Sequence, residues 1–210
     1  MAWFTRFTRF GDAHLVFGQE ANMSCGIASI LMCVFKINKF TPGAKALRTN
    51  KEVYDLYTSV SGSTYKPETQ GTDPALLASV LNQLNCGKWT GKYVDAKTVT
   101  STILQKVRSQ GGFGPTSDVK PIIAGVGWSG GGGHAVCIDT VRRFDGKSYA
   151  TVCDPWDSNV HIVPVAAATP FNYEAGKGGL AVDFWGEHKG QKNPYPKTHQ
   201  GKGIAVIYRD

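Results

Sequence analysis

The pair Asp145-Gly146 is the sequence feature that most limits how this chain can fold. It joins residues 134–144 and 148–156, two stretches rich in β-branched and apolar side chains. Asp-Gly between such stretches is a strong signal for the two-residue turn of a β-hairpin. We therefore expect the two stretches to be antiparallel neighbours, so that the end of the second returns toward the beginning of the first.

The first half of the chain has the residue spacing of helices. After Cys25, apolar residues recur three and four positions apart, as they do on one face of a helix. A second apolar stripe begins after Asp73, which can cap a helix, and Pro74, which suits the first helical position. Besides the helix after Cys25, we expect helices at residues 44–57, 73–84 and 97–109.

The second half of the chain has the pattern of strands, with short apolar runs separated by turn residues. Helices followed by a run of strands indicate an α+β fold. We expect one domain, residues 1–210, with a mainly helical lobe at 1–115 and a mainly antiparallel β lobe at 116–210. A cleft between two such lobes is a natural place for a site. Besides the hairpin, strands are expected at residues 121–128, 159–165, 179–185 and 203–208.

Composition excludes several classes of protein. The net charge is +7, but the basic residues are dispersed, and no zinc-finger or RNA-binding signature accompanies them, so a nucleic-acid partner is not expected. No apolar stretch approaches the length of a membrane span, and the N-terminus lacks the pattern of a secretory signal. We expect a protein made in a cytoplasm, with no membrane partner, and export without a signal peptide stays open.

The cysteines point to one reactive thiol and not to a framework. There are five of them, an odd number, at irregular spacing and without a CxxC pair, so neither disulfides nor a zinc site is expected. We predict that the chain uses no metal and no other cofactor. Cys33, Cys86, Cys137 and Cys153 are expected to be core thiols.

Cys25 differs from the other cysteines because it stands where a helix begins, after Ser24, which can cap that helix. A helix N-terminus and a neighbouring imidazolium both favour the thiolate, which is the nucleophilic form of cysteine. Among the five histidines, His134 follows a run of glycines and opens a strand. The pair Cys25 and His134 is therefore the candidate nucleophile and base.

A histidine base needs a third group that fixes its tautomer. Asp154 lies on the partner strand of the hairpin, near the end that returns toward His134. Asp157 is an alternative, because simple two-residue-turn pairing brings it about as close. Asp139 is five residues along the strand from His134, so its side chain is expected on the opposite face. For the oxyanion of acyl transfer, the backbone N–H of Cys25 and the side chain of Gln19 are the candidate donors.

Taken together, Gln19, Cys25-Gly26, His134 and the sequence Asp154-Pro155-Trp156 resemble the papain-like cysteine peptidases. Residues 25–34 with 133–156 most resemble the C39-like branch, bacterial peptidases that typically cleave after a double glycine. The resemblance implies that Gln19 is the oxyanion donor, Cys25 the nucleophile, His134 the base and Asp154 the orienting residue. It also implies substrate contacts for the residues around this centre, namely Gly26, Trp128, Gly133 and Trp156.

The resemblance also implies a biological setting. Free-standing domains of this kind occur as bacterial toxins delivered into other cells, which a cognate immunity protein restrains. We therefore expect a cysteine endopeptidase that cleaves glycine-rich sites in a protein substrate, with an immunity protein that covers the cleft. Papain-like folds also host deamidases, transglutaminases and peptidoglycan amidases with the same triad, and a domain used only for binding is a third class. Intact Gln19, Cys25, His134 and Asp154 argue against the last of these.

Overall fold

The computed structural model describes residues 2–38, 45, 47–108, 119–127, 133–173, 181–182 and 204–210. The chain has an α+β fold with four helices and two antiparallel sheets in this part. The helices are α1 (Cys25–Asn38), α2 (Asn50–Ser61), α3 (Pro74–Gln83) and α4 (Ala96–Lys106). The strands are β1 (Trp3–Thr8), β2 (Ala13–Phe17), β3 (Trp89–Val94), β4 (Ile122–Gly127), β5 (Gly133–Phe144), β6 (Lys147–Asp154), β7 (Asn159–Val165), β8 (Ala181–Val182) and β9 (Ile204–Arg209).

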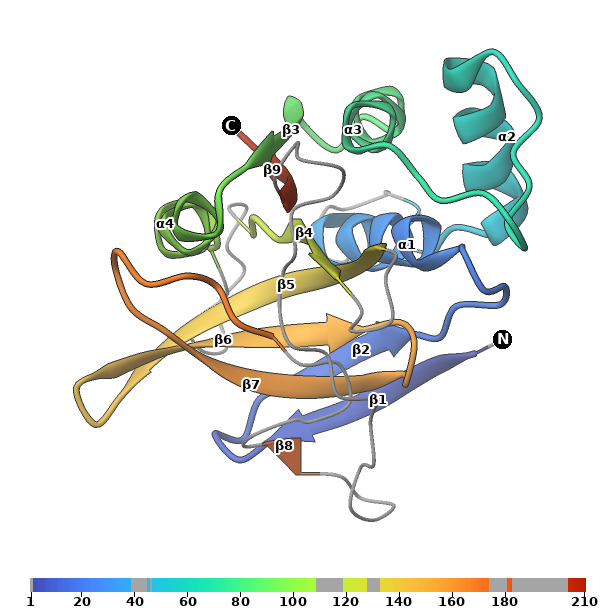
Figure 1. Cartoon of the computed structure of the whole chain (residues 1–210). Helices are drawn as coiled ribbons and strands as arrows, with labels where there is room; N and C mark the ends of the chain where they lie inside the picture. The colour runs from blue at the N-terminus through green and yellow to red at the C-terminus, as the bar shows by residue number, and fades with distance from the viewer. Residues whose placement is uncertain are drawn as a thin grey trace.

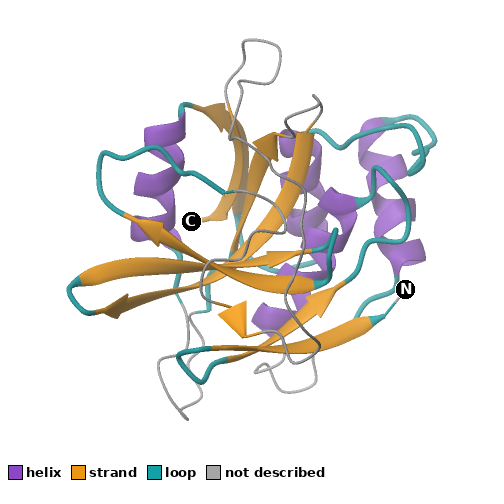
Figure 2. Cartoon of the chain, turned by 60° about the horizontal axis from the view of Figure 1, so that its bottom comes forward, coloured by secondary structure: helices purple, strands orange, loops and turns teal. Residues whose placement is uncertain are grey.

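The larger sheet forms the centre of the molecule, with the strand order β3-β9-β4-β5-β6-β7. The smaller sheet, β2-β1-β8, lies below β6 and β7 in Figure 1. Helix α1 packs on β5 and also contacts β2, α2 and α3, whereas α4 lies apart from these three helices, beside β4, β5 and β9. Figure 2, coloured by secondary structure, shows the strands running between the separate groups of helices.

Two apolar cores lie on the two faces of the larger sheet. The first joins α1, α2 and α3 to Ala135 and Cys137 of β5. The second joins α4 to Val136 and Ile138, the alternate residues of the same strand, and includes Tyr173. Because successive side chains of a strand point to opposite faces, β5 contributes to both cores. This strand therefore fixes the relative position of the helices that flank the sheet.

The hairpin predicted from Asp145-Gly146 is present between β5 and β6. Both turn residues have positive φ, 48° at Asp145 and 72° at Gly146, as a two-residue hairpin turn requires. The register runs from Phe144 opposite Lys147 and shifts by one residue at a bulge between Ile138 and Thr140. The bulge changes which residues of β6 come back to the start of β5, and the Asp-Gly signal does not encode it.

The helices begin where their capping residues stand. Asp73 caps α3 through hydrogen bonds from the N–H groups of Ala75 and Leu76, as predicted. Helix α2 begins at Asn50, later than the expected residue 44, because Thr49 and Glu52 form a reciprocal capping box there. Helix α4 is confirmed at nearly the expected bounds.

Three strands in the first half were not predicted. All four helices lie before residue 115, as expected, but β1, β2 and β3 lie there as well, so that part of the chain is not only a helical lobe. The three-residue spacing of Phe4, Phe7 and Phe10 hides the period-two alternation of β1. In β3, a Cβ on Gly91 would approach the carbonyl oxygen of Pro74 to 2.0 Å, so glycine there allows the strand to pack closely on α3.

Some predictions fall outside the described residues. One of them concerns Trp128, which was expected to contact substrate. The strand expected at residues 179–185 is described only as β8. Within the described part of the chain, no helix has both the length and the apolar character needed to cross a membrane.

Candidate active site

Cys25 is the first residue of α1, as the sequence predicts. The hydroxyl of Ser24 does not cap the helix. It donates to the carbonyl of Ala21 at 2.9 Å and accepts from the Ala21 N–H at 3.0 Å, which closes the preceding turn. The N–H of Gly26 instead forms a hydrogen bond to the Cys25 sulfur. One backbone N–H of the first turn of α1 is thus bonded to the thiol and not to a capping side chain.

The start of β5 lies against the start of α1. The ladder between β5 and β6 begins at Cys137, whereas Ala135 pairs with Gly125 of β4. Ala135 also contacts helix α1. The Ser29 hydroxyl donates to the Ala135 carbonyl at 3.2 Å, and the Ala135 N–H forms a hydrogen bond to the Cys25 sulfur. Because Ala135 follows His134 directly, these bonds fix the imidazole beside the thiol.

His134 is held between Cys25 and Asp154. Its Nε2 lies 2.6 Å from Oδ1 of Asp154, and its side chain forms a hydrogen bond with Cys25. Since Nε2 serves the carboxylate, Nδ1 is the ring nitrogen left for the sulfur. The side chains of His134 and Asp154 are 2% and 0% exposed, so bulk water does not weaken the pair.

The choice between Asp154 and Asp157 is decided by these contacts. Asp154 is hydrogen-bonded to His134, whereas Asp157 lies 2.7 Å from Nε2 of His161 on β7. Asp139 is paired with His14 and Lys36. The bulge in β5 explains why simple two-residue-turn pairing pointed to Asp157 as well.

Cys25, His134 and Asp154 stabilise one another's charged forms, and their pKa values shift accordingly. Burial alone would raise the pKa of Cys25, but the hydrogen bond and charge of His134, with the N–H groups of Ala135 and Gly26, lower it. Burial alone would lower the pKa of His134, but the Asp154 carboxylate and Cys25 raise it to about 10. Burial opposes the charge of Asp154 too, yet His134, His161 and Tyr173 lower its pKa to about 2. A thiolate–imidazolium pair is therefore favoured over the neutral thiol and imidazole.

The other thiols have no such environment. Cys86, Cys137 and Cys153 are buried, and burial raises the pKa of each one. Cys33 lies on α1, fully buried, with its sulfur 3.7 Å from that of Cys137. All five cysteines are free thiols. The pKa of Cys25, in contrast to those of Cys86, Cys137 and Cys153, is lowered.

Gln19 lies in the loop that leads into α1, but its side-chain amide is engaged. The Nε2 donates to the carbonyls of Ala21 at 2.8 Å and Asn22 at 3.2 Å, and the backbone N–H donates to Pro155 at 2.9 Å. The loop is therefore anchored to the segment that follows Asp154. Before Gln19 can donate to an oxyanion, its side-chain Nε2 must break one of these two hydrogen bonds.

The residues expected to contact substrate lie in different settings. Gly26 is buried, and a Cβ there would come within 2.1 Å of Thr72 Oγ1, so its small size serves the packing of α1. Gly133 is exposed at the start of β5, and Trp156 is 43% exposed. The backbone N–H of Trp156 donates to Oδ1 of Asp154 at 2.8 Å. Trp128 lies outside the described residues.

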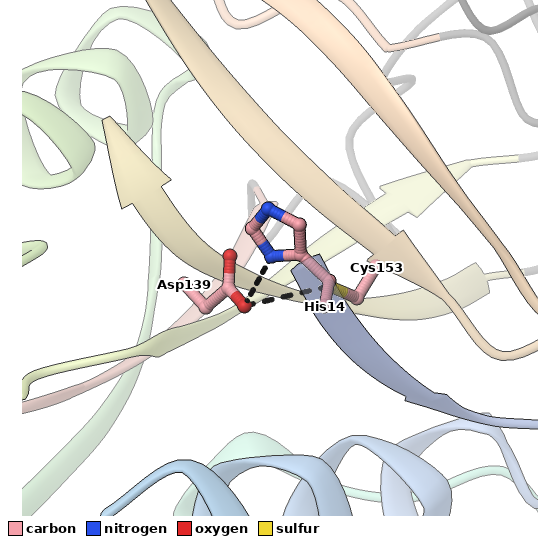
Figure 3. Close-up of side chains that lie close together, drawn as sticks. All are labelled: His14, Asp139 and Cys153. Atoms are coloured by element: carbon pink, nitrogen blue, oxygen red, sulfur yellow. Dashed lines mark hydrogen bonds and ion pairs between the residues drawn. The ribbon is translucent and has the colours of Figure 1, made fainter. Parts of the chain in front are cut away.

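A second buried cluster, drawn in part in Figure 3, lies around Asp139. Oδ2 of Asp139 is 2.9 Å from Nδ1 of His14, 3.7 Å from the sulfur of Cys153 and 2.7 Å from Nζ of Lys36. His14, Asp139 and Cys153 have donor atoms close enough to share a metal ion. However, the Asp139 carboxylate raises the pKa of Lys36 against the effect of burial, so an ammonium already neutralises it. We interpret the cluster as a charge-paired network that joins β2, α1, β5 and β6.

A third group, Asp154, Asp157 and His161, also has donor atoms close together. Asp154 is occupied by three hydrogen-bond donors and Asp157 by His161. Tyr173, one of the donors to Asp154, and Ala135 were not predicted as parts of the site. A tyrosine between two predicted strands has no spacing signal, and a backbone donor has no side chain that the sequence could reveal.

Replacing Asp154 with alanine tests its contact with His134. We expect alkylation of Cys25 by iodoacetamide at neutral pH to slow about tenfold or more, because the imidazolium that stabilises the thiolate loses its carboxylate. Asp157→Ala is the matched control, since Asp157 is also a nearly buried carboxylate bound to a histidine. We expect it to leave the alkylation rate within about threefold of the wild-type value. Equal losses in the two variants, at comparable Tm, would contradict the assignment of Asp154.

Compared with models of known protein families and with curated protein sequences, the chain matches none. The chemistry of the site therefore has to be argued from its geometry. A buried thiol with a lowered pKa at a helix start and an imidazole fixed by a carboxylate are the parts that nucleophilic acyl transfer uses.

Proposed function

We propose that this protein is a cysteine endopeptidase of the papain-like, C39-like type. The order of elements supports the proposal, because the nucleophile begins a helix in the first half and the base and carboxylate lie on a later β-hairpin. The observation that carries the proposal is the state of Cys25. Its pKa is lowered although the side chain is buried, and its partner His134 is bound by Asp154. A purely structural thiol has no need of this arrangement.

The reaction follows from the positions of these groups. The Cys25 thiolate attacks the carbonyl carbon of the scissile peptide, and the Cys25 N–H at the start of α1 stabilises the oxyanion. The His134 imidazolium then protonates the leaving amine, which leaves an acyl thioester on Cys25. In the second half, His134 takes a proton from water as the water attacks the thioester, and the C–S bond then breaks, which releases the carboxylic acid product and restores the Cys25 thiolate. Asp154 keeps the imidazole in the required tautomer throughout.

The resemblance to the C39-like branch suggests the substrate. We propose cleavage after a Gly-Gly sequence in a target protein, by a bacterial toxin that an immunity protein restrains. The net charge of +7 favours acidic proteins in both roles. In this proposal the immunity protein covers the cleft at Cys25 and prevents cleavage in the cell that makes the toxin.

The test is to incubate the purified protein with a bacterial lysate and to map new protein N-termini by mass spectrometry. Cys25→Ala protein serves as the matched inactive control, because it retains the surface and lacks the nucleophile. We expect new termini in the wild-type sample alone, clustered after Gly-Gly. The sequences around these termini would identify the substrate.

Other outcomes select other functions. Glutamine-to-glutamate conversion in lysate proteins without new termini would replace the peptidase proposal with a deamidase, and cross-linked lysine–glutamine pairs would indicate a transglutaminase. Cut muropeptides, after incubation with purified cell walls, would indicate a peptidoglycan amidase. If none of these reactions and no preferential alkylation of Cys25 were found, the site would be a binding site.

A further inference from the structure

The phenol of Tyr173 lies at the far side of the candidate active site from Cys25. Its hydroxyl donates to Oδ2 of Asp154 at 2.5 Å, and both residues are buried, with Tyr173 1% and Asp154 0% exposed. A hydrogen bond to an ionised group is stronger than one between neutral groups, and no bulk water is available here to replace it.

The two oxygens of the Asp154 carboxylate have different partners. Oδ1 receives Nε2 of His134 at 2.6 Å and the backbone N–H of Trp156 at 2.8 Å. Oδ2 receives the hydroxyl of Tyr173. The backbone of Trp156 and the side chain of Tyr173 thus hold the plane of the carboxylate from its two sides. In this orientation Oδ1 faces the imidazole.

Tyr173 is itself held by elements outside the hairpin. The N–H of Phe171, two residues earlier, donates to the carbonyl of Ala96 at 3.0 Å, which ties this segment to the start of α4. The ring of Tyr173 lies 5.5 Å from the ring of His161 on β7, and Asp157 in turn binds His161. The position of the hydroxyl is therefore determined by α4 and β7 together.

We propose that Tyr173 is a positioning residue, which orients Asp154 and through it the imidazole of His134. The proposal rests on the proposed function insofar as it concerns turnover. Without the hydroxyl, the buried Oδ2 loses its donor, and the carboxylate rotates toward other donors. The bond to His134 Nε2 then lengthens, and the imidazole loses its fixed orientation toward Cys25. Substrate contacts are unchanged, so the loss affects kcat and leaves KM the same.

The experiment compares Tyr173→Phe with Tyr57→Phe. Tyr57 is the matched control, because it is also a buried tyrosine, 2% exposed, and its hydroxyl accepts the N–H of Asp73, away from Asp154. The first measurement is the proton NMR resonance of His134 Nε2–H, which a short bond to a carboxylate moves far downfield. It needs no substrate. The second is kcat and KM on the substrate found in the lysate.

We expect Tyr173→Phe to move the His134 resonance upfield or broaden it, and to lower kcat about tenfold at unchanged KM. Tyr57→Phe is expected to leave both unchanged at a comparable Tm. An unchanged resonance in Tyr173→Phe would overturn the proposal. If wild-type protein shows no peptidase activity, the proposed function fails, while the NMR comparison alone decides the role of Tyr173.

If Tyr173→Phe does not fold, 3-fluorotyrosine at position 173 replaces it. This residue keeps the shape of tyrosine and makes the hydroxyl a stronger donor to Asp154. We then expect a measurable shift of the His134 Nε2–H resonance, because the shared carboxylate couples the two bonds. A resonance identical to that of the wild type would overturn the proposal.

Discussion

Replacing Cys25 with alanine is expected to reduce peptide hydrolysis by at least about 10⁴-fold, because the variant has no atom that can form the thioester. The fold is expected to survive. Cys25 is the first residue of α1, alanine is the best helix former, and the change removes a single sulfur atom from a site at the edge of the core. The measurement is kcat/KM on a Gly-Gly peptide, together with the Tm of both proteins.

Cys33→Ala is the control for this variant. Cys33 lies on the same helix and is fully buried, so its replacement costs packing and leaves the nucleophile in place. We expect a lower Tm with kcat/KM within about threefold of the wild-type value. If Cys25→Ala retained cleavage, or if both variants lost it equally, Cys25 would not be the nucleophile.

Replacing His134 with alanine is expected to lower kcat/KM about 10³- to 10⁴-fold. Two effects combine. The thiolate loses the imidazolium that stabilises it, so the pKa of Cys25 rises as its burial dictates, and the leaving amine loses its proton donor. Alkylation of Cys25 by iodoacetamide at neutral pH should slow as well, which separates the first effect from the second.

His14→Gln is the matched control for His134→Ala. His14 is also a buried histidine bound to a carboxylate, Asp139, at 2.9 Å, but it belongs to the other cluster. Its replacement is expected to lower Tm and to leave alkylation of Cys25 at the wild-type rate. A slowed alkylation in His14→Gln at a temperature where the protein is folded would mean that the effect of His134 is not specific.

Much of the fold follows from local signals. Asp73-Pro74 marks the start of α3, and Asp145-Gly146 marks the turn of the β5–β6 hairpin, because each pair fixes backbone geometry within a few residues. The strands of the first half have weaker signals. Strand β3 is short and contains Gly91, and it is held by β9, which lies more than a hundred residues further along the chain. Such pairing is decided by tertiary contacts that a local pattern does not contain.

The candidate site was predictable where side chains carry the chemistry. The pattern around Cys25 indicates a helix start, and the hairpin places His134 near either Asp154 or Asp157. The final choice depends on the bulge in β5, which shifts the register by one residue.

The remaining parts depend on backbone groups or on distant segments. The Ala135 N–H bonds to Cys25 from a part of β5 that precedes its ladder with β6. Tyr173 reaches Asp154 from a segment beyond β7 that α4 anchors. Ser24, predicted to cap α1, bonds Ala21 instead, because the turn before the helix brings that residue closer. The contacts of Ala135 and Tyr173 exist only once the tertiary structure has formed, whereas the contact between Ser24 and Ala21 is local and competes with helix capping.

The most direct test of the central claim, that Cys25 is an activated thiolate, is its rate of alkylation by iodoacetamide at pH 6 and pH 8, followed by peptide mass mapping. Because the pKa of Cys25 is lowered and that of His134 is raised to about 10, the thiolate persists to lower pH than in an ordinary thiol. We expect the Cys25 rate to fall much less between pH 8 and pH 6 than the rate of an ordinary thiol. An ordinary thiol with a pKa of about 8.5 slows about 80-fold between pH 8 and pH 6. A Cys25 rate that falls like that of an ordinary thiol, or that does not exceed the rates of the other four cysteines, would contradict the account.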